Sequence, residues 1–190
     1  MSAPLILGFD TSGPHCAAAL TLGETPLRAV GEDMARGQAE RLMDLLQELL
    51  TAEGKTWADL SAIAVGTGPG NFTGLRIGVS AARGLALGLG IPAYGVTGFD
   101  ARVHAAPQGR TITIPAPRDM VYVHDEGDAH LIPADAVTAP APAPSPADLA
   151  VGVALHAARI WPASAPPPAP YYVRPPDAAP ARDAPPRVLS

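Results

Sequence analysis

With 190 residues, the chain can bury a sizeable core, and its single cysteine, Cys16, excludes an internal disulfide framework. The formal net charge is −5, from 13 basic and 18 acidic residues. This balance argues against the chain gripping nucleic acid alone, because phosphate neutralisation needs clustered Lys and Arg. The apolar run at residues 5–9 is too short for the core of a secretory signal and lacks a basic flank, so we expect a cytoplasmic location.

Glycine and proline divide the chain near residue 100. Sixteen of the 19 glycines lie in residues 1–100, whereas 18 of the 23 prolines lie after them. The composition predicts a packed α/β lobe over 1–100, a shortened, proline-rich second lobe over 101–175 and a mobile tail over 176–190.

The first lobe begins with three strands in hairpin relation. Apolar runs at residues 5–10 and 16–22 flank a turn, and a third strand is expected near residues 26–31. Cys16 falls inside the second strand, which favours a buried, inert thiol over a nucleophile.

Helices and strands then alternate. Leucines at positions 42, 45, 46, 49 and 50 have helical spacing, and Gly54 is a suitable stop. A strand at residues 60–65, a second helix and a strand at residues 91–96 follow. This order predicts an α/β fold with a mixed sheet and flanking helices.

A glycine-dense turn at residues 66–78 joins the fourth strand to the second helix. It lacks the lysine of a P-loop, and Asn71 stands where the dinucleotide fingerprint needs glycine. Backbone N–H groups at such a helix start could still meet an anion. The turn could equally serve only to join strand and helix tightly.

Small residues recur every four positions along the second helix, at Gly74, Gly78, Ala82, Ala86 and Gly90. Glycine costs on the order of 1 kcal/mol against alanine inside a helix, so close backbone packing should offset it. The packing partner is either the chain's own sheet or another protein.

The second half carries fewer signals. Residues 110–115, 120–125 and 129–132 suggest strands. Ser145 followed by Pro146 and Asp148 is typical of a helix start, and we expect that helix to run to about Trp161.

Catalytic constellations are scarce. No two of the five histidines stand four apart, as a helical metal pair requires. Asp10, at the end of the first strand and beside Thr11 and Ser12, could hold a hydrated metal or the N–H groups of its own turn. Its plain alternative is an Asx-turn cap.

Two motifs resemble a known family. Ile6-Leu-Gly-Phe-Asp-Thr-Ser12 resembles the opening hairpin of the actin/Hsp70/sugar-kinase superfamily. Gly68-Pro-Gly-Asn-Phe-Thr-Gly-Leu-Arg76 is similar to the signature of the bacterial TsaB (YeaZ) proteins, and Pro170-Tyr-Tyr-Val-Arg174 is similar to an element near that family's C-terminus. The resemblance implies an actin-like, ribonuclease H-like first lobe.

The resemblance also implies a function. TsaB proteins are non-catalytic subunits that bind and activate TsaD, the enzyme that makes threonylcarbamoyladenosine in ANN-decoding tRNAs, together with the ATPase TsaE. The older glycoprotease-like label reflects kinship with TsaD. From the resemblance we expect a competing homodimer, contact with tRNA only through the complex, and no membrane partner. No cofactor is expected in the isolated chain, and ATP or ADP with Mg²⁺ would act only in the assembled complex.

In the family, two helices form the dimerisation surface, and they correspond here to Gln38–Ala52 and Phe72–Leu89. The implied interface residues are Gln38, Arg41, Leu42, Leu45, Leu49, Phe72, Leu75, Arg76, Gly78, Val79, Ala82 and Ala86. The residues that could approach a nucleotide in the complex are Asp10, Thr11, Gly68, Gly70, Asn71 and Thr73. No catalytic or metal residue is implied.

The sequence departs from the family at Asn71, where serine is usual, at Gly37, where many relatives have histidine, and in its shortened second half. Two other functions stay open. One is an autonomous kinase or ATPase of the same superfamily using Asp10 and the glycine turn. The other is a homodimer outside any complex.

Overall fold

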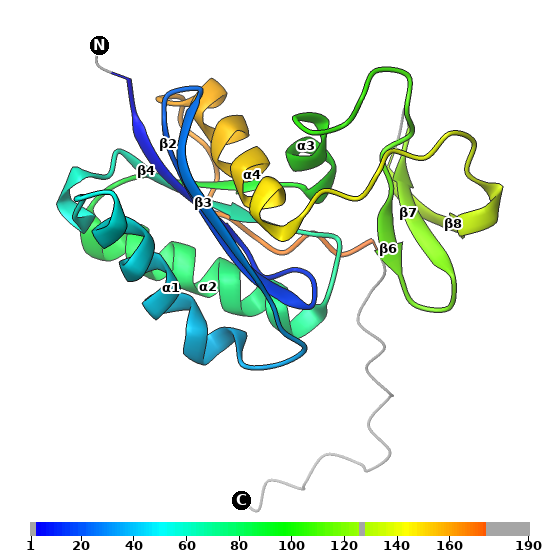
Figure 1. Ribbon diagram of the computed structural model, residues 1–190, viewed down its shortest axis with the longest axis horizontal. Coiled ribbons are helices and arrows are strands. Elements are labelled where there is room, and N and C mark those ends of the chain that lie inside the picture. Colours follow the sequence, from blue (N-terminus) through cyan, green and yellow to red (C-terminus); the bar gives the residue numbers. More distant parts are fainter. Residues whose placement is uncertain (1–2, 126–127, 174–190) are drawn as a thin grey trace, which may run out of the picture.

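The computed structural model describes residues 3–125 and 128–173, and its main body is a five-stranded sheet with helices on both faces (Figure 1). The strands are β1 (Leu5–Asp10), β2 (His15–Leu22), β3 (Thr25–Asp33), β4 (Ala62–Gly66) and β5 (Ala93–Val96), in the spatial order β3-β2-β1-β4-β5. The first three strands pair antiparallel, while β4 runs parallel to β1 and β5 parallel to β4. The predicted α/β fold with a mixed sheet is confirmed.

Two helices, α1 (Gln38–Ala52) and α2 (Phe72–Leu89), cover one face of this sheet (Figure 1). Both have the predicted bounds. Alternate strand side chains, among them Leu7 and Phe9 of β1, join the buried leucines of α1 in one core cluster. Every second residue of the strand faces the helices, and the leucines that recur every three to four residues along α1 face the strand, so the two sets form one core.

The opposite face of the sheet is covered by α4 (Pro146–Ile160) and the short helix α3 (Gly98–Val103). The alternate side chains of the strands, such as Ile6, pack there against Val153 and Ala154. The approach is close, because a Cβ on Gly8 would lie 2.8 Å from the backbone nitrogen of Ala154. Ser145 caps α4 by accepting a hydrogen bond from the backbone N–H of Asp148 over 3.1 Å, as predicted.

The position of α4 corrects the predicted division of the chain. Residues 146–160 were assigned to a second lobe over 101–175, yet they complete the core of the first lobe. The physical reason is that the sheet has two apolar faces, and α1 and α2 cover only one of them. The first lobe therefore includes residues far beyond 100.

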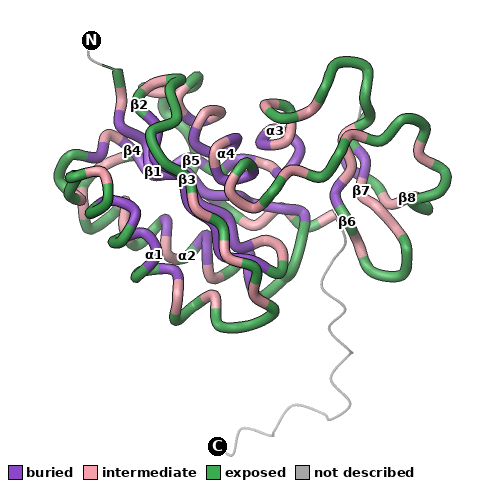
Figure 2. The backbone as a smooth tube through the Cα atoms, viewed as in Figure 1, coloured by how far each residue is buried: buried purple, intermediate pink, exposed green. Residues whose placement is uncertain are grey.

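The rest of the second half forms a three-stranded antiparallel sheet of β6 (Ile114–Ala116), β7 (Met120–His124) and β8 (Ala129–Pro133). The first of these strands is shorter than predicted, since Thr111 makes an isolated bridge to Pro140. Figure 2 shows that burial is concentrated in the main sheet and the inner helix faces, while this small sheet is largely half-buried or exposed. The predicted tail at 176–190 lies outside the described residues.

Two single-turn 3₁₀ helices, η1 (Trp57–Asp59) and η2 (Ala134–Ala136), complete the described elements. Thr56 and Asp59 form a capping box at η1. None of the described helices is both long enough and apolar enough to cross a bilayer.

Candidate functional site

The carboxyl ends of β1 and β4 meet at one edge of the main sheet, and the turns that follow them make the candidate site. Asp10, at the end of β1, is only 1 % exposed. Its Oδ1 accepts hydrogen bonds from the backbone N–H of Ser12 at 2.9 Å, from the Ser12 hydroxyl at 2.8 Å and from His15 Nε2 at 2.7 Å. Asp10 thus caps its own Asx turn and holds the His15 ring.

Burial and hydrogen bonding act in opposite directions on the pKa of Asp10. Burial raises the pKa of this carboxyl, but the bond to His15 and the bonds from Ser12 outweigh it and leave the pKa below its ordinary value. The carboxylate is therefore the stable form of Asp10 in the folded protein.

Thr11 and Gly70 join the first turn to the glycine turn. The Thr11 hydroxyl donates to the Gly74 carbonyl oxygen over 2.7 Å, and the Asn71 N–H donates to the Ser12 carbonyl oxygen over 2.7 Å. A Cβ on Gly70 would overlap the Ser12 carbonyl oxygen. Glycine is needed here because the two backbones touch.

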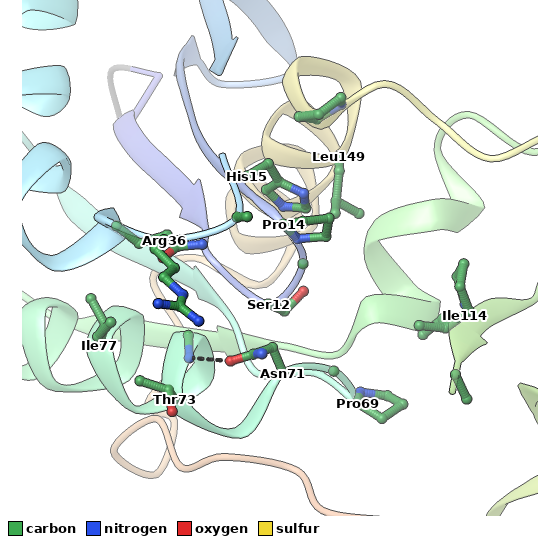
Figure 3. A pocket seen from close by; sticks show the side chains of 18 of the residues that line it. Ser12, Pro14, His15, Arg36, Pro69, Asn71, Thr73, Ile77, Ile114 and Leu149 are labelled. Atoms are coloured by element: carbon green, nitrogen blue, oxygen red, sulfur yellow. Dashed lines mark hydrogen bonds between the residues drawn. The ribbon is translucent and has the colours of Figure 1, made fainter. Parts of the chain in front are cut away.

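The Asn71 side chain caps α2 by accepting the Gly74 N–H over 2.9 Å (Figure 3), and asparagine is among the preferred N-cap residues. Gly68 has a φ of 98°, in the left-handed region that favours glycine. The turn therefore serves at least as a tight joint between β4 and α2.

The first three members of the small-residue stripe of α2, Gly74, Gly78 and Ala82, pack against the chain itself. A Cβ on Gly74 would overlap the Thr11 carbonyl oxygen, and one on Gly78 would lie 2.7 Å from the Thr11 Oγ1 and 3.3 Å from Val65. Of the two packing partners considered for this stripe, the structure shows the chain's own sheet.

Much of the predicted interface is corrected by burial. Seven of its residues lie in the protein's own core and present no surface to a partner: Leu42, Leu45, Leu49, Leu75, Gly78, Val79 and Ala82. Helical periodicity identified an apolar stripe correctly but could not say what covers it. Here the sheet covers it.

The remaining predicted interface residues are accessible. Phe72 and Arg76 are exposed, while Gln38, Arg41 and Ala86 are half-buried. Arg41 is already paired, with Glu32 at 2.7 Å and Glu48 at 2.6 Å.

Sequence reasoning missed two exposed apolar side chains on the same helices. Leu87 of α2 is 86 % exposed and Met43 of α1 is 43 % exposed. The signal was available for Leu87, which falls on the helix face opposite the buried positions of α2, whereas Met43 lies at the flank of the buried face of α1.

An aromatic cluster lies at the start of α2. The rings of Phe72 and Tyr172 stack with centroids 5.2 Å apart, and the guanidinium carbon of Arg76 lies 3.8 Å from the Phe72 centroid. Arg76 Nε also donates to the Tyr172 hydroxyl over 3.3 Å. The Tyr171 N–H donates to the Thr67 carbonyl oxygen over 2.8 Å, which fixes this C-terminal segment beside the glycine turn.

A cavity of about 930 Å³ opens between the two turns, the start of α1 and the small sheet (Figure 3). Of the six residues predicted near a nucleotide, Gly70, Asn71 and Thr73 line it, whereas Asp10, Thr11 and Gly68 lie behind its wall. His15, Arg36 and Arg102 also line it and were not predicted. No local sequence motif joins these three, so only the fold brings them together.

Other candidate chemistry is limited within the part of the chain that the structure describes. There, no group of three His, Cys, Asp or Glu side chains is placed to hold a metal ion. Cys16 is buried, and burial raises the pKa of its thiol to about 11, which agrees with the predicted inert role.

Comparison with known proteins assigns the family. A family model described as "TsaD: tRNA N6-adenosine threonylcarbamoyltransferase" matches residues 29–143. A Pseudomonas aeruginosa crystal structure, titled an uncharacterized protein with similarity to peptidase YeaZ, superposes with a TM-score of 0.61 at 31% identity, covering 74% of this chain and 70% of that one. The chain belongs to the TsaD-type family, in its TsaB (YeaZ) group.

Curated relatives in the TsaB group match over about half of this chain. The Escherichia coli K12 "tRNA threonylcarbamoyladenosine biosynthesis protein TsaB" is 41% identical over 92 residues, which cover 48% of this chain and 39% of that protein. The Haemophilus influenzae protein of the same name is 34% identical over 101 residues, which cover 53% of this chain and 42% of that protein. The match thus spans less than half the length of either relative.

Proposed function

We propose that this chain is a non-catalytic subunit of tRNA threonylcarbamoyladenosine biosynthesis that binds and activates a TsaD-type transferase. Membership of the TsaB group supports the pathway, since curated members carry that name. The observation that carries the scaffold role is that large apolar side chains on α1 and α2 are exposed to solvent. We call this solvent-facing side, which includes Met43, Phe72, Arg76 and Leu87, the outer helix face.

This outer helix face has the composition of a binding surface. Leu87 and Met43 lie on neighbouring helices, and Phe72 with Arg76 and Tyr172 adds an aromatic and arginine anchor at one end. Aromatic and arginine side chains are enriched at protein interfaces, and apolar patches on a monomer often mark such sites. The face replaces the buried residues that the sequence predicted for the same role.

The proposed partners extend to a TsaE-type ATPase and to a second copy of this chain, which would compete for the outer helix face. Contact with tRNA would run through the complex, in keeping with a net charge of −5. ATP or ADP with Mg²⁺ would take part in catalysis only in the assembled complex. Gly70, Asn71 and Thr73 are the predicted nucleotide-proximal residues that face a cavity.

A binding assay with matched variants tests the scaffold role. Leu87→Glu places a charge on the outer helix face, whereas Val103→Glu places one at an apolar side chain that is 55 % exposed on α3, on the other side of the sheet. We expect Leu87→Glu to weaken capture of the TsaD-type subunit of the same cell by at least tenfold and to lower tRNA modification, with little effect from Val103→Glu. Equal capture by both variants would remove α2 from the interface.

The alternatives have separate tests. An autonomous kinase or ATPase gains some support from the cavity beside the glycine turn, and it requires turnover of Mg-ATP by the isolated chain. Calorimetry that shows heat of hydrolysis without a partner would favour it. A homodimer outside any complex would be excluded if a TsaD-type subunit co-purifies with the chain from its native cell.

A further inference from the structure

The two edges of the main sheet differ in how the described part of the chain covers them. At the β5 edge, the segment that follows α4 runs beside the strand. The Tyr94 hydroxyl donates to the Ala163 carbonyl oxygen over 2.9 Å, and a Cβ on Gly95 would lie 3.4 Å from the Cα of Pro168. At the other edge, β3 has no further strand beside it among the described residues. An uncovered edge strand offers unpaired backbone N–H and C=O groups to another chain.

A hydrogen bond just past the end of β3 shows which backbone groups face outward. The Met34 N–H donates to the Pro14 carbonyl oxygen over 2.9 Å, so at position 34 the backbone points toward the β2 side. This direction alternates along an antiparallel ladder, and the register is regular over residues 28–33. Ala29 and Gly31 therefore point their N–H and C=O groups away from β2. Both residues are exposed, so the edge is open at the middle of the strand.

The start of β3 is unsuited to pairing with a further strand. Pro26 has no N–H to donate, and the register with β2 shifts between Leu20 and Thr21, opposite this part of β3. Residues 28–33 contain no proline and no shift in register. A strand that adds to this edge must therefore fit residues 28–33.

The charges along residues 28–33 make this stretch complementary to itself. Arg28 is basic, Glu32 is acidic, and Val30 lies midway between them. Two copies that pair antiparallel about Val30 place Arg28 of each copy directly opposite Glu32 of the other, which is a favourable cross-strand pair. Pairing about position 28 or 32 would set like charges opposite each other. Pairing about position 29 or 31 would set each charge opposite an uncharged residue, so the charges favour Val30 as the centre.

The neighbouring ion pairs extend this complementarity. Val30 packs against the core cluster under α1, so Arg28 and Glu32 lie on the same sheet face as that helix. Arg28 pairs with Glu53 at 2.6 Å, and Glu32 pairs with Arg41 at 2.7 Å. In the register centred on Val30, Arg28 lies between Glu53 of its own copy and Glu32 of the other. The charges then alternate in sign across the contact.

We propose that the β3 edge is a self-association site, to which a second copy of this chain adds its own β3 antiparallel about a two-fold axis at Val30. Ala29 of each copy then faces Gly31 of the other as a hydrogen-bonded pair, which gives about four backbone hydrogen bonds. The contact is isologous, because each copy contributes the same residues. The two five-stranded sheets join into one continuous sheet.

The β3 edge is separate from the outer helix face. Arg41, which meets Glu32 at the β3 edge, stands two residues before Met43 of the outer helix face, so the two side chains lie about 200° apart around α1. Pairing through β3 therefore goes beyond the proposed scaffold function and leaves the outer helix face free for a TsaD-type subunit. It is a different contact from the competing homodimer proposed at that face.

Analytical ultracentrifugation of the full chain over a concentration series tests the proposal. A single strand pair buries little surface, so we expect a monomer–dimer equilibrium with a dissociation constant between about 1 and 300 µM. Ala29→Pro removes an outward N–H and keeps those that point to β2, so it should weaken the dimer at least tenfold. Leu87→Glu, the matched variant on the outer helix face, should change it less than twofold. A chain that stays monomeric at about 0.5 mM, or a dimer lost only in Leu87→Glu, overturns the proposal.

Cysteine cross-linking tests the register. In the proposed pair, Val30 lies opposite Val30 of the other copy at a position without hydrogen bonds, where Cα atoms are about 4.5 Å apart and a disulfide can form. Val30→Cys should therefore give a disulfide-linked dimer under mild oxidation. Thr25→Cys, an exposed site on the same strand, would hold its two thiols roughly 30 Å apart and should stay unlinked. The native Cys16 is buried and does not compete.

The proposed register is wrong if Val30→Cys does not cross-link, or if Thr25→Cys cross-links as readily. The cross-linking result decides the matter alone if Ala29→Pro does not fold by circular dichroism. Capture of a TsaD-type subunit should be unchanged in Ala29→Pro, whereas Leu87→Glu should lose capture and keep the dimer. Failure of the β3 contact is thereby distinguished from failure of the scaffold function.

Discussion

The hydroxyl of Thr11 donates a hydrogen bond to the carbonyl oxygen of Gly74 over 2.7 Å, although one residue follows β1 and the other belongs to the first turn of α2. At the same point a Cβ on Gly74 would overlap the Thr11 carbonyl oxygen. The contact joins the opening hairpin to the glycine turn at backbone distance, and it makes this glycine of α2 a requirement of packing.

Alanine substitutions in α2 should have opposite effects at two glycines. Gly74→Ala forces backbone apart and should destabilise the protein by about 3 kcal/mol. Gly84→Ala meets nothing within 4 Å and should stabilise it by about 1 kcal/mol, because alanine is the better helix former. Urea unfolding of both variants measures the difference. Equal destabilisation would contradict the packing described for the stripe.

The cluster of Phe72, Arg76 and Tyr172 should show energetic coupling. Removing Arg76 and Tyr172 singly and together loses a cation–π contact, a ring stack and one hydrogen bond. A double-mutant cycle of Arg76 and Tyr172 by denaturant unfolding isolates their direct hydrogen bond and should give a coupling energy of about 0.5–1.5 kcal/mol.

Arg83 supplies the control for this cycle, because it lines the same shallow groove as Arg76 and Tyr172. The losses of unfolding free energy caused by Arg83→Ala and by Tyr172→Ala should add up in the double variant to within about 0.5 kcal/mol. Additivity of the Arg76 pair would mean that the cluster does not hold the C-terminal segment.

Asp10→Asn should make the protein less stable in a pH-dependent way. Since the folded pKa of Asp10 lies below its ordinary value of 3.8, the folded state binds fewer protons than the unfolded state near that pH. The ionised Asp10 carboxylate therefore stabilises the folded protein above about pH 4, and this contribution is lost as the pH falls through the folded pKa of Asp10. At pH 7 we expect the free energy of unfolding of Asp10→Asn to be about 1–3 kcal/mol below that of the parent protein, and this difference should become smaller at lower pH.

Urea unfolding of the Asp10→Asn protein between pH 3 and pH 7 checks this expectation. Asp44→Asn, which changes an exposed carboxyl of α1, should stay within about 0.5 kcal/mol of the parent protein at pH 7. A constant difference between parent and Asp10→Asn across the whole range would show that the Asp10 charge is unimportant.

Cys16 should resist thiol reagents in the folded protein. The side chain is fully buried, and a thiol pKa of about 11 leaves very little thiolate at pH 8. Labelling with a chromogenic disulfide should therefore be slow in buffer and immediate above the urea midpoint. Rapid stoichiometric labelling without denaturant would reveal local opening of β2.

The sequence predicted the first hundred residues well because their patterns are strong. The leucine spacing predicts the buried face of α1, and the helix bounds implied by the family resemblance agree with α1 and α2 as observed. Leucine periodicity shows only that a helix face is apolar, however, so it could not say that Leu45 is buried in the protein's own core while Leu87 is exposed.

Two other features depend on tertiary structure. The small residues of α4 favour close packing, but nothing in residues 146–160 says which sheet receives them. Arg36 and Arg102 come from separate segments and meet at one cavity only because the small sheet closes against the main one. Local propensity carries no information about such long-range meetings.

The place of α4 has a consequence for synthesis on the ribosome. Until residues 146–160 emerge, α4 cannot cover the sheet face that includes Ile6, Ala62 and Ala64. At about 5–20 residues per second, the nascent chain must wait several seconds after β5 before that face is closed. Chaperone demand during translation should therefore peak in this interval.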